Sequence, residues 1–175
     1  QQQRVPSMKG ILKEALKETE QEAQDKEERA RNIMIFRAKE PPGNSRKARE
    51  DSDKKFVEGL LQELGTENIE FDNVIRLGKK EQEKDRPLRF RVKDTQQKSE
   101  IMRQLKNLKG AEEPYSSISV SHDLNTSQRD ELKSLVTEAK AQNTKEWSYK
   151  VVSNPGPHWD PKIVKYKVRQ QTRQD

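Results

Sequence analysis

The sequence predicts an α+β protein in three parts: an N-terminal helix that ends a coiled coil, a central βαββαβ unit and a small α+β unit at the C-terminus. One observation is composition: of 175 residues, 38% are charged and only 29% are hydrophobic, too few for one large core. A second is a helix-forming stretch without proline over residues 8–31. A third is that short β-branched and aromatic runs alternate with segments of helical periodicity over residues 32–169.

Residues 8–31 form the predicted end of a coiled coil. Leucines at 12 and 16 open a heptad seam that then weakens, because its next positions are Thr19, Ala23, Lys26 and Ala30. The alternative is a solvated single helix with charge pairs at i,i+4 spacing. Residues 11–30 carry four basic and seven acidic side chains, so this arm is not the anion-binding part. Because the chain starts with Gln1, we expect a longer protein with further heptads upstream.

Residues 32–123 carry the βαββαβ pattern. Two helices are predicted, one capped by Asp51 or Ser52 and ending at Gly65, the other capped by Asp94 and ending at Gly110. The predicted strands are 33–36, 73–77, 88–92 and 118–120. This order is typical of the ferredoxin-like sandwich, in which four antiparallel strands carry both helices on one face and leave the other face open.

Residues 124–169 form the predicted C-terminal domain, followed by a tail at 170–175. A helix capped by Asn125 or Thr126 runs to about Asn143, with four apolar side chains on one face. A hairpin follows, with strands at 147–152 and 163–168 around a turn rich in proline and glycine.

The open sheet face is the candidate site. Alternation along residues 88–92 directs Leu88, Phe90 and Val92 toward the helices and leaves Arg89 and Arg91 outward. The same rule buries Ile33 and Ile35 and turns Met34 and Phe36 outward. Aromatic rings and guanidinium planes stack on bases, and arginine donates to phosphate, so this face suits single-stranded nucleic acid, as in the RNA-recognition motif. Residues 74–93 carry eight basic and three acidic side chains, which concentrates positive charge there.

Other function classes find less support. The chain has no cysteine and two histidines, His122 and His158, so we expect no metal site, no cofactor and no enzymatic activity. No apolar run could cross a membrane and no secretory leader is visible, which favours an intracellular location. The strand at 88–92 holds one aromatic residue where RNA-recognition motifs usually hold two. A coiled-coil scaffold whose ferredoxin-like domain binds protein therefore remains the alternative.

Five short motifs and their order along the chain resemble the first-open-reading-frame protein of LINE-class non-LTR retrotransposons, and the resemblance covers about residues 20–170. They are Arg31–Phe36, Val74–Lys79, Arg86–Phe90, Ile118–Leu124 and Gln128-Arg129. The resemblance implies a homotrimeric coiled coil, an RNA-recognition-motif domain and a C-terminal domain that coat element RNA and act as a nucleic-acid chaperone. It implies a cytoplasmic ribonucleoprotein, with the nucleus as a second compartment. Arg37 stands where a glycine is common in the family.

The expected partner is single-stranded RNA, with single-stranded DNA as a second ligand. The resemblance implies that Arg76 binds RNA and that Arg129 is the basic position opening the C-terminal helix. The alternatives are an ion pair of Arg76 with Glu70 or Asp72, and packing of Phe36 under the C-terminal segment. The residues predicted to contact nucleic acid are Arg76, Arg89, Arg91, Met34, Phe36, Lys79, Lys80 and Arg129.

Overall fold

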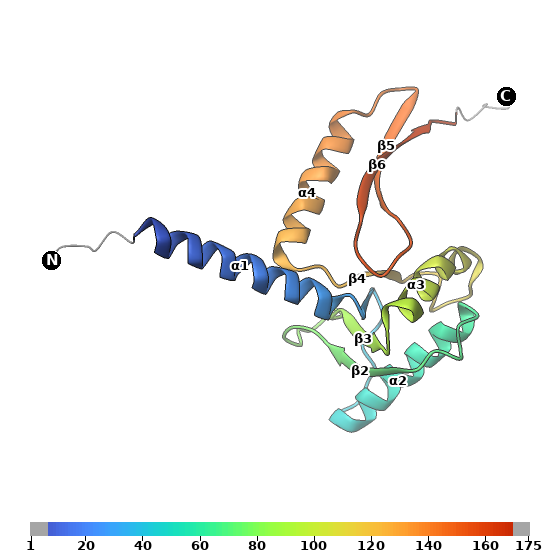
Figure 1. The fold of residues 1–175 in the computed structure, drawn as a ribbon. Coiled ribbons are helices and arrows are strands. Elements are labelled where there is room, and N and C mark those ends of the chain that lie inside the picture. Colours follow the sequence, from blue (N-terminus) through green and yellow to red (C-terminus); the bar gives the residue numbers. More distant parts are fainter. Residues whose placement is uncertain (1–6, 170–175) are drawn as a thin grey trace, which may run out of the picture.

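The computed structural model describes residues 7–169, so the predicted tail at 170–175 lies outside the described residues. The α+β fold class is confirmed: an N-terminal helix precedes two antiparallel sheets (Figure 1). The elements are α1 (Met8–Arg29), β1 (Asn32–Phe36), α2 (Arg46–Glu63), β2 (Phe71–Arg76), β3 (Leu88–Val92), α3 (Thr95–Gln104), the 3₁₀ helix η1 (Leu105–Gly110), β4 (Ser119–His122), α4 (Thr126–Ala141), β5 (Trp147–Ser153) and β6 (Pro161–Lys167).

Helix α1 projects away from the rest of the molecule (Figure 1). None of its side chains is buried, so caps, local pairs and one ion pair from its last turn, Arg29 to Asp123, hold it. The Ser7 hydroxyl accepts a hydrogen bond from the amide of Gly10, and Lys26 pairs with Glu22 one turn away. Its four large apolar side chains, Met8, Ile11, Leu12 and Leu16, are more than half exposed. A single chain therefore leaves the predicted seam uncovered.

The four-stranded sheet has the order β2-β3-β1-β4, and every neighbouring pair is antiparallel. Helices α2 and α3 supply apolar residues that cover one of its faces. The predicted inward residues of β1 and β3 are confirmed, since each is at most 1% exposed. The core they share with the helices includes Ile33, Ile35, Leu88, Phe90, Val92, Val57, Leu60, Leu61 and Ile101.

Several boundaries differ from the predicted ones. Helix α2 starts earlier than expected, because the Ser45 hydroxyl accepts from the amide of Ala48 and caps it. Strand β2 starts at Phe71, whose ring packs edge-on against Phe90 at a centroid distance of 6.0 Å. Arg37, which directly follows β1, has φ of 64°, in the left-handed region that favours glycine. That conformation explains why glycine suits this position.

The C-terminal helix and hairpin form a second, thinner layer. A capping box between Asn125 and Gln128 starts α4, and the helix lies along β5. Ala139 is its one buried residue, so this layer has a small core of its own. The hairpin loop reaches back toward α3 and β4 (Figure 1). There Pro157 and Trp159 line a small cavity with residues of α1, α3 and β4.

Candidate nucleic-acid interface

Side chains from all four strands form rows across the sheet face that points away from α2 and α3. In one row Ile75 lies opposite Arg89, Arg89 opposite Met34, and Met34 opposite Ser121. In the next row Arg91 lies between Asp72 and Asn32. Both arginines of β3 thus share one face with the predicted outward residues of β1, as alternation requires.

Arg89 and Arg91 keep most of their hydrogen-bonding capacity. Arg91 donates from Nε to Oδ1 of Asn32 at 2.8 Å. The Arg89 side chain is 22% exposed, and its Nη1 lies 3.8 Å from Oδ2 of Asp123, a loose ion pair. Within residues 7–169 no acceptor takes the Nη hydrogens of Arg91 or any hydrogen of the Arg89 guanidinium in a hydrogen bond. These groups can therefore donate to a phosphate or to a base edge.

Asp123 links this face to helix α1. Its Oδ1 accepts from Nη1 of Arg29 at 2.9 Å, and its Oδ2 accepts from Nδ2 of Asn32 at 2.8 Å. Asn32 in turn accepts from Arg91, so one chain of hydrogen bonds runs from the end of α1 to β3. The sequence identified Asp123 only as part of a motif, because its partners lie more than ninety residues earlier in the chain.

The apolar part of the face is smaller than predicted. Phe36 is 38% exposed and Ile75 is 36% exposed, so both can pack against a ligand. Met34 lies on the predicted face but is only 5% exposed. This corrects the expectation of an accessible thioether. Met34 sits on a central strand with Arg89 and Ser121 on either side, so neighbouring side chains enclose it.

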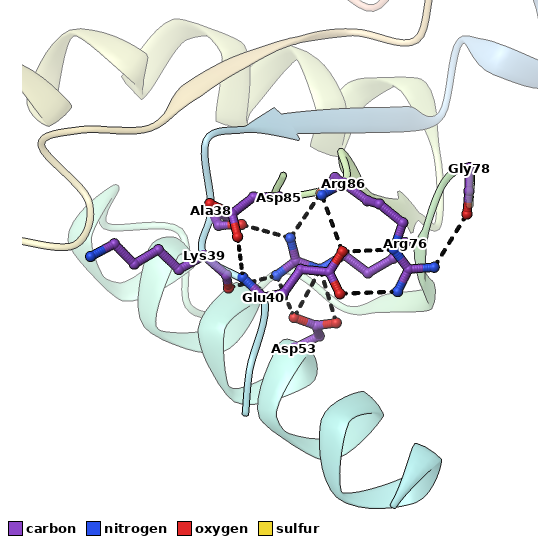
Figure 2. A network of polar contacts seen from close by, with 8 residues as sticks. All are labelled: Ala38, Lys39, Glu40, Asp53, Arg76, Gly78, Asp85 and Arg86. Carbon is purple, nitrogen blue, oxygen red and sulfur yellow. Dashed lines mark hydrogen bonds and ion pairs between the residues drawn. The ribbon is translucent and has the colours of Figure 1, made fainter. Parts of the chain in front are cut away.

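Arg76 lies on the other side of the sheet in a buried network (Figure 2). Its Nε and Nη2 donate to the carboxylate of Asp53 at 2.7–3.2 Å. Nη1 donates to the carbonyls of Ala38 and Arg86 at 2.7 and 2.8 Å, and Nη2 donates to the carbonyl of Lys39 at 3.0 Å. These bonds occupy every N–H of the guanidinium, and the side chain is 5% exposed. In this arrangement Arg76 has no donor left for RNA, and its acidic partner is neither Glu70 nor Asp72.

Arg86 is also used internally. It donates to both carboxylate oxygens of Glu40, at 2.7 and 3.1 Å, and its Nη1 donates to the carbonyl of Gly78. The hydrogen bonds from Arg86 lower the pKa of Glu40 to about 2. The acidic partners of Arg76 and Arg86 both lie outside residues 74–93, so the surplus of five positive charges in that segment is reduced to three.

The remaining predicted residues are accessible but lie off the sheet rows. Lys79 and Lys80 are exposed in the loop between β2 and β3, close in sequence to the Lys84–Glu81 ion pair. Arg129 is exposed in the first turn of α4, where it donates to the hydroxyl of Thr126. The face therefore brings together Arg89, Arg91, Met34 and Phe36, and it leaves Arg76 and Arg129 elsewhere.

The C-terminal hairpin carries a basic and aromatic surface whose pairings were not predicted. The ammonium of Lys165 lies 3.9 Å from the ring centroid of Trp147, and that of Lys150 lies 5.9 Å from the centroid of Tyr166. Tyr166 is 44% exposed. Such side chains could stack on bases and attract phosphates, although each of the two rings already has a lysine ammonium over its face.

Comparison of the sequence with protein-family models and with curated proteins finds no match. Across residues 7–169, no helix is both long and apolar enough to span a membrane. In the same range, no three acidic or histidine side chains are grouped so that they could hold a metal ion.

Proposed function

We propose that the chain binds single-stranded RNA without catalysing a reaction, as the RNA-coating protein of a retrotransposon ribonucleoprotein. The observation that best supports this proposal is that two arginines are extensively hydrogen-bonded inside the protein and two others are not. The guanidinium groups of Arg76 and Arg86 donate their hydrogen bonds to acceptors inside the protein. Those of Arg89 and Arg91 lie on an open sheet face, and most of their N–H groups make no hydrogen bond within the described residues. Exposed Phe36 and Ile75 share that face, so charge and apolar stacking surface occur together.

The strand order supports a ferredoxin-like topology of the RNA-recognition-motif type. The chain order is βαββαβ, and β1 and β3 occupy the centre of the sheet. In such a sheet the two central strands present their outward residues to a ligand, and here those residues include Phe36, Arg89 and Arg91. The position of the free arginines on a central strand favours a ligand that lies across the sheet.

Helix α1 supplies the means to combine several such faces. Its uncovered apolar stripe fits the homotrimeric coiled coil that the family resemblance implies. Linking weak sites raises the overall affinity through effective concentration, without any new contact. We propose that RNA coating and chaperone activity arise from this multivalency.

The test is fluorescence anisotropy of a labelled, unstructured RNA titrated over a series of salt concentrations. Arg89→Ala with Arg91→Ala should weaken binding and reduce the slope of log K against log salt by about 1.4, since each lost phosphate contact is worth about 0.7 for a single strand. Lys54→Ala with Lys55→Ala, on exposed positions of α2, changes net charge equally and should leave the slope close to wild type. Equal losses in both double variants would show that net charge alone drives binding.

The scaffold hypothesis has one observation in its favour, the exposed pair Phe36 and Ile75 on a face with a single aromatic residue. Protein binding through these side chains would be nearly independent of salt and would be lost in Phe36→Ala with Ile75→Ala. Titration with DNA of the same sequence separates recognition of the 2′-hydroxyl from general binding of single strands.

A further inference from the structure

A small cavity lies where five parts of the chain meet: the last turn of α1, the start of α3, the end of β4, the first turn of α4 and the tip of the hairpin. Its volume is about 20 Å³, and its lining includes Arg29, Lys98, His122, Asp123 and Trp159. A space of this size holds about one water-sized particle. Asp123 connects it to the open sheet face through the loose ion pair with Arg89, but none of its lining residues is among those predicted to contact RNA.

Lys98 is the first anomaly at this junction. The residue is 1% exposed, and within residues 7–169 no hydrogen bond or ion pair involves its ammonium, whose Nζ keeps a small contact with solvent. Asp123 acts on it only at longer range, and both oxygens of that carboxylate already accept from Arg29 and Asn32. Burial lowers the pKa of Lys98 to about 8, so the ammonium is still mostly charged at neutral pH. A buried, unpaired charge is unfavourable and calls for a counter-ion.

His122 is the second anomaly. It is 6% exposed, and neither of its ring nitrogens has a hydrogen-bond partner within the described residues. Burial and the nearby Lys98 lower the pKa of His122 to about 4, while the backbone of Pro157 acts in the opposite direction and raises it. The imidazole is therefore neutral at pH 7 and still has one N–H to donate.

The charged side chains around the cavity are mostly basic. Lys26 and Arg29 face it from α1, and Lys98 faces it from α3. The hairpin contributes His158, while Asp123 is the one carboxylate in the lining. Asp123 is already paired with Arg29, so the ammonium of Lys98 is the uncompensated group.

We propose that this cavity binds one monatomic anion, chloride under physiological conditions, held by the ammonium of Lys98 and the N–H of His122. A volume of about 20 Å³ fits one monatomic anion more closely than a phosphate or a carboxylate, which favours a halide. Residues Pro157–Trp159 line the site from the hairpin, so the bound anion joins the C-terminal hairpin to α3 and β4. This site adds to the proposed RNA face and does not depend on it.

The solution test is thermal unfolding of the full chain at pH 7 in sodium chloride and in sodium gluconate of equal ionic strength. The Tm should rise with chloride and saturate about 2–4 °C above the gluconate series, as for a site that shifts the folding equilibrium about fivefold. Lys98→Met should remove this difference, and its Tm in gluconate should be at least that of wild type, because the uncompensated charge is gone. Lys106→Met, at an exposed position on η1, changes net charge equally and should keep the difference.

Equal Tm values of the wild type in the two salts would overturn the proposal, and so would an unchanged chloride response in Lys98→Met. Crystals of the wild-type chain grown with bromide provide a second test that does not depend on any variant folding. An anomalous peak between Nζ of Lys98 and the ring of His122 is expected. A site there filled only by water would refute anion binding.

Discussion

Replacing Arg76 with methionine should destabilise the protein strongly and leave the RNA-binding face intact. The substitution keeps a long side chain but removes every hydrogen bond in the network of Figure 2 that starts from the guanidinium. The carboxylate of Asp53, whose side chain is 8% exposed, then loses its cationic partner. The carbonyls of Ala38, Lys39 and Arg86 lose their donors at the same time.

The magnitude follows from those losses. Removing one partner of a buried ion pair costs about 3–5 kcal/mol. Unpaired carbonyls add to that cost, but relaxation and water entry offset part of it, so we expect a loss of about 4–6 kcal/mol in the free energy of unfolding. At about 2–4 °C per kcal/mol for a chain of this size, the Tm should fall by roughly 10–20 °C. Arg76→Lys keeps a charge beside Asp53 but cannot reach the three carbonyls, and it should lose about half as much.

Urea denaturation followed by far-UV circular dichroism measures this free energy. Arg89→Met is the matched control on the open face and should change it by no more than about 0.5 kcal/mol. RNA anisotropy at 10 °C, in conditions where the variants stay folded, should show the reverse ranking: near wild-type affinity for Arg76→Met and weakened binding for Arg89→Met. If Arg76→Met stayed within about 1 kcal/mol of wild type and lost RNA affinity, the assignment of Arg76 to a structural role would be refuted.

Four further outcomes are expected. Gly59→Ala should lower the free energy of unfolding by about 1–3 kcal/mol, because the new Cβ would lie 1.9 Å from the hydroxyl of Tyr115. Adding Tyr115→Phe to this variant should restore part of the loss, and the midpoints of urea unfolding measure both effects. The folded-state pKa of Glu40, about 2, lies below its ordinary value of 4.5, so its stabilising contribution is present above pH 4.5 and is lost as the pH falls toward 2. Screening by solvent reduces this contribution from the full linkage value to about 2 kcal/mol. Glu40→Gln should flatten the pH dependence of the urea midpoint in that window, and an unchanged profile would contradict the role of this ion pair. Arg37→Gly should raise the free energy of unfolding by about 0.5–1 kcal/mol by relieving the left-handed backbone, a gain that a lower urea midpoint would disprove. Sedimentation equilibrium of the full chain should show mainly monomer at micromolar concentration, since the seam positions Thr19, Ala23 and Lys26 bury little apolar area, whereas a tight trimer would show a stronger seam.

Local periodicity was enough to predict the parts of the fold that depend on neighbours along the chain. Alternation over Leu88–Val92 separated three fully buried residues from two arginines, because successive side chains of a strand point to opposite faces whatever the strand pairs with. The caps at Asp94 and Asn125 were predicted for the same reason, since a capping hydrogen bond spans only three residues.

Tertiary structure decided which partners the charged side chains meet. Arg76 and Arg89 are both arginines of the four-stranded sheet, yet one meets Asp53 of α2 and the other lies on an open face. The burial of Lys98 likewise depends on the return of the hairpin tip to α3. These environments are set by contacts between segments far apart in the chain, where burial and low dielectric determine the energy of a charge. Alternation along a strand gives the face on which a side chain lies but not the partners that it meets there.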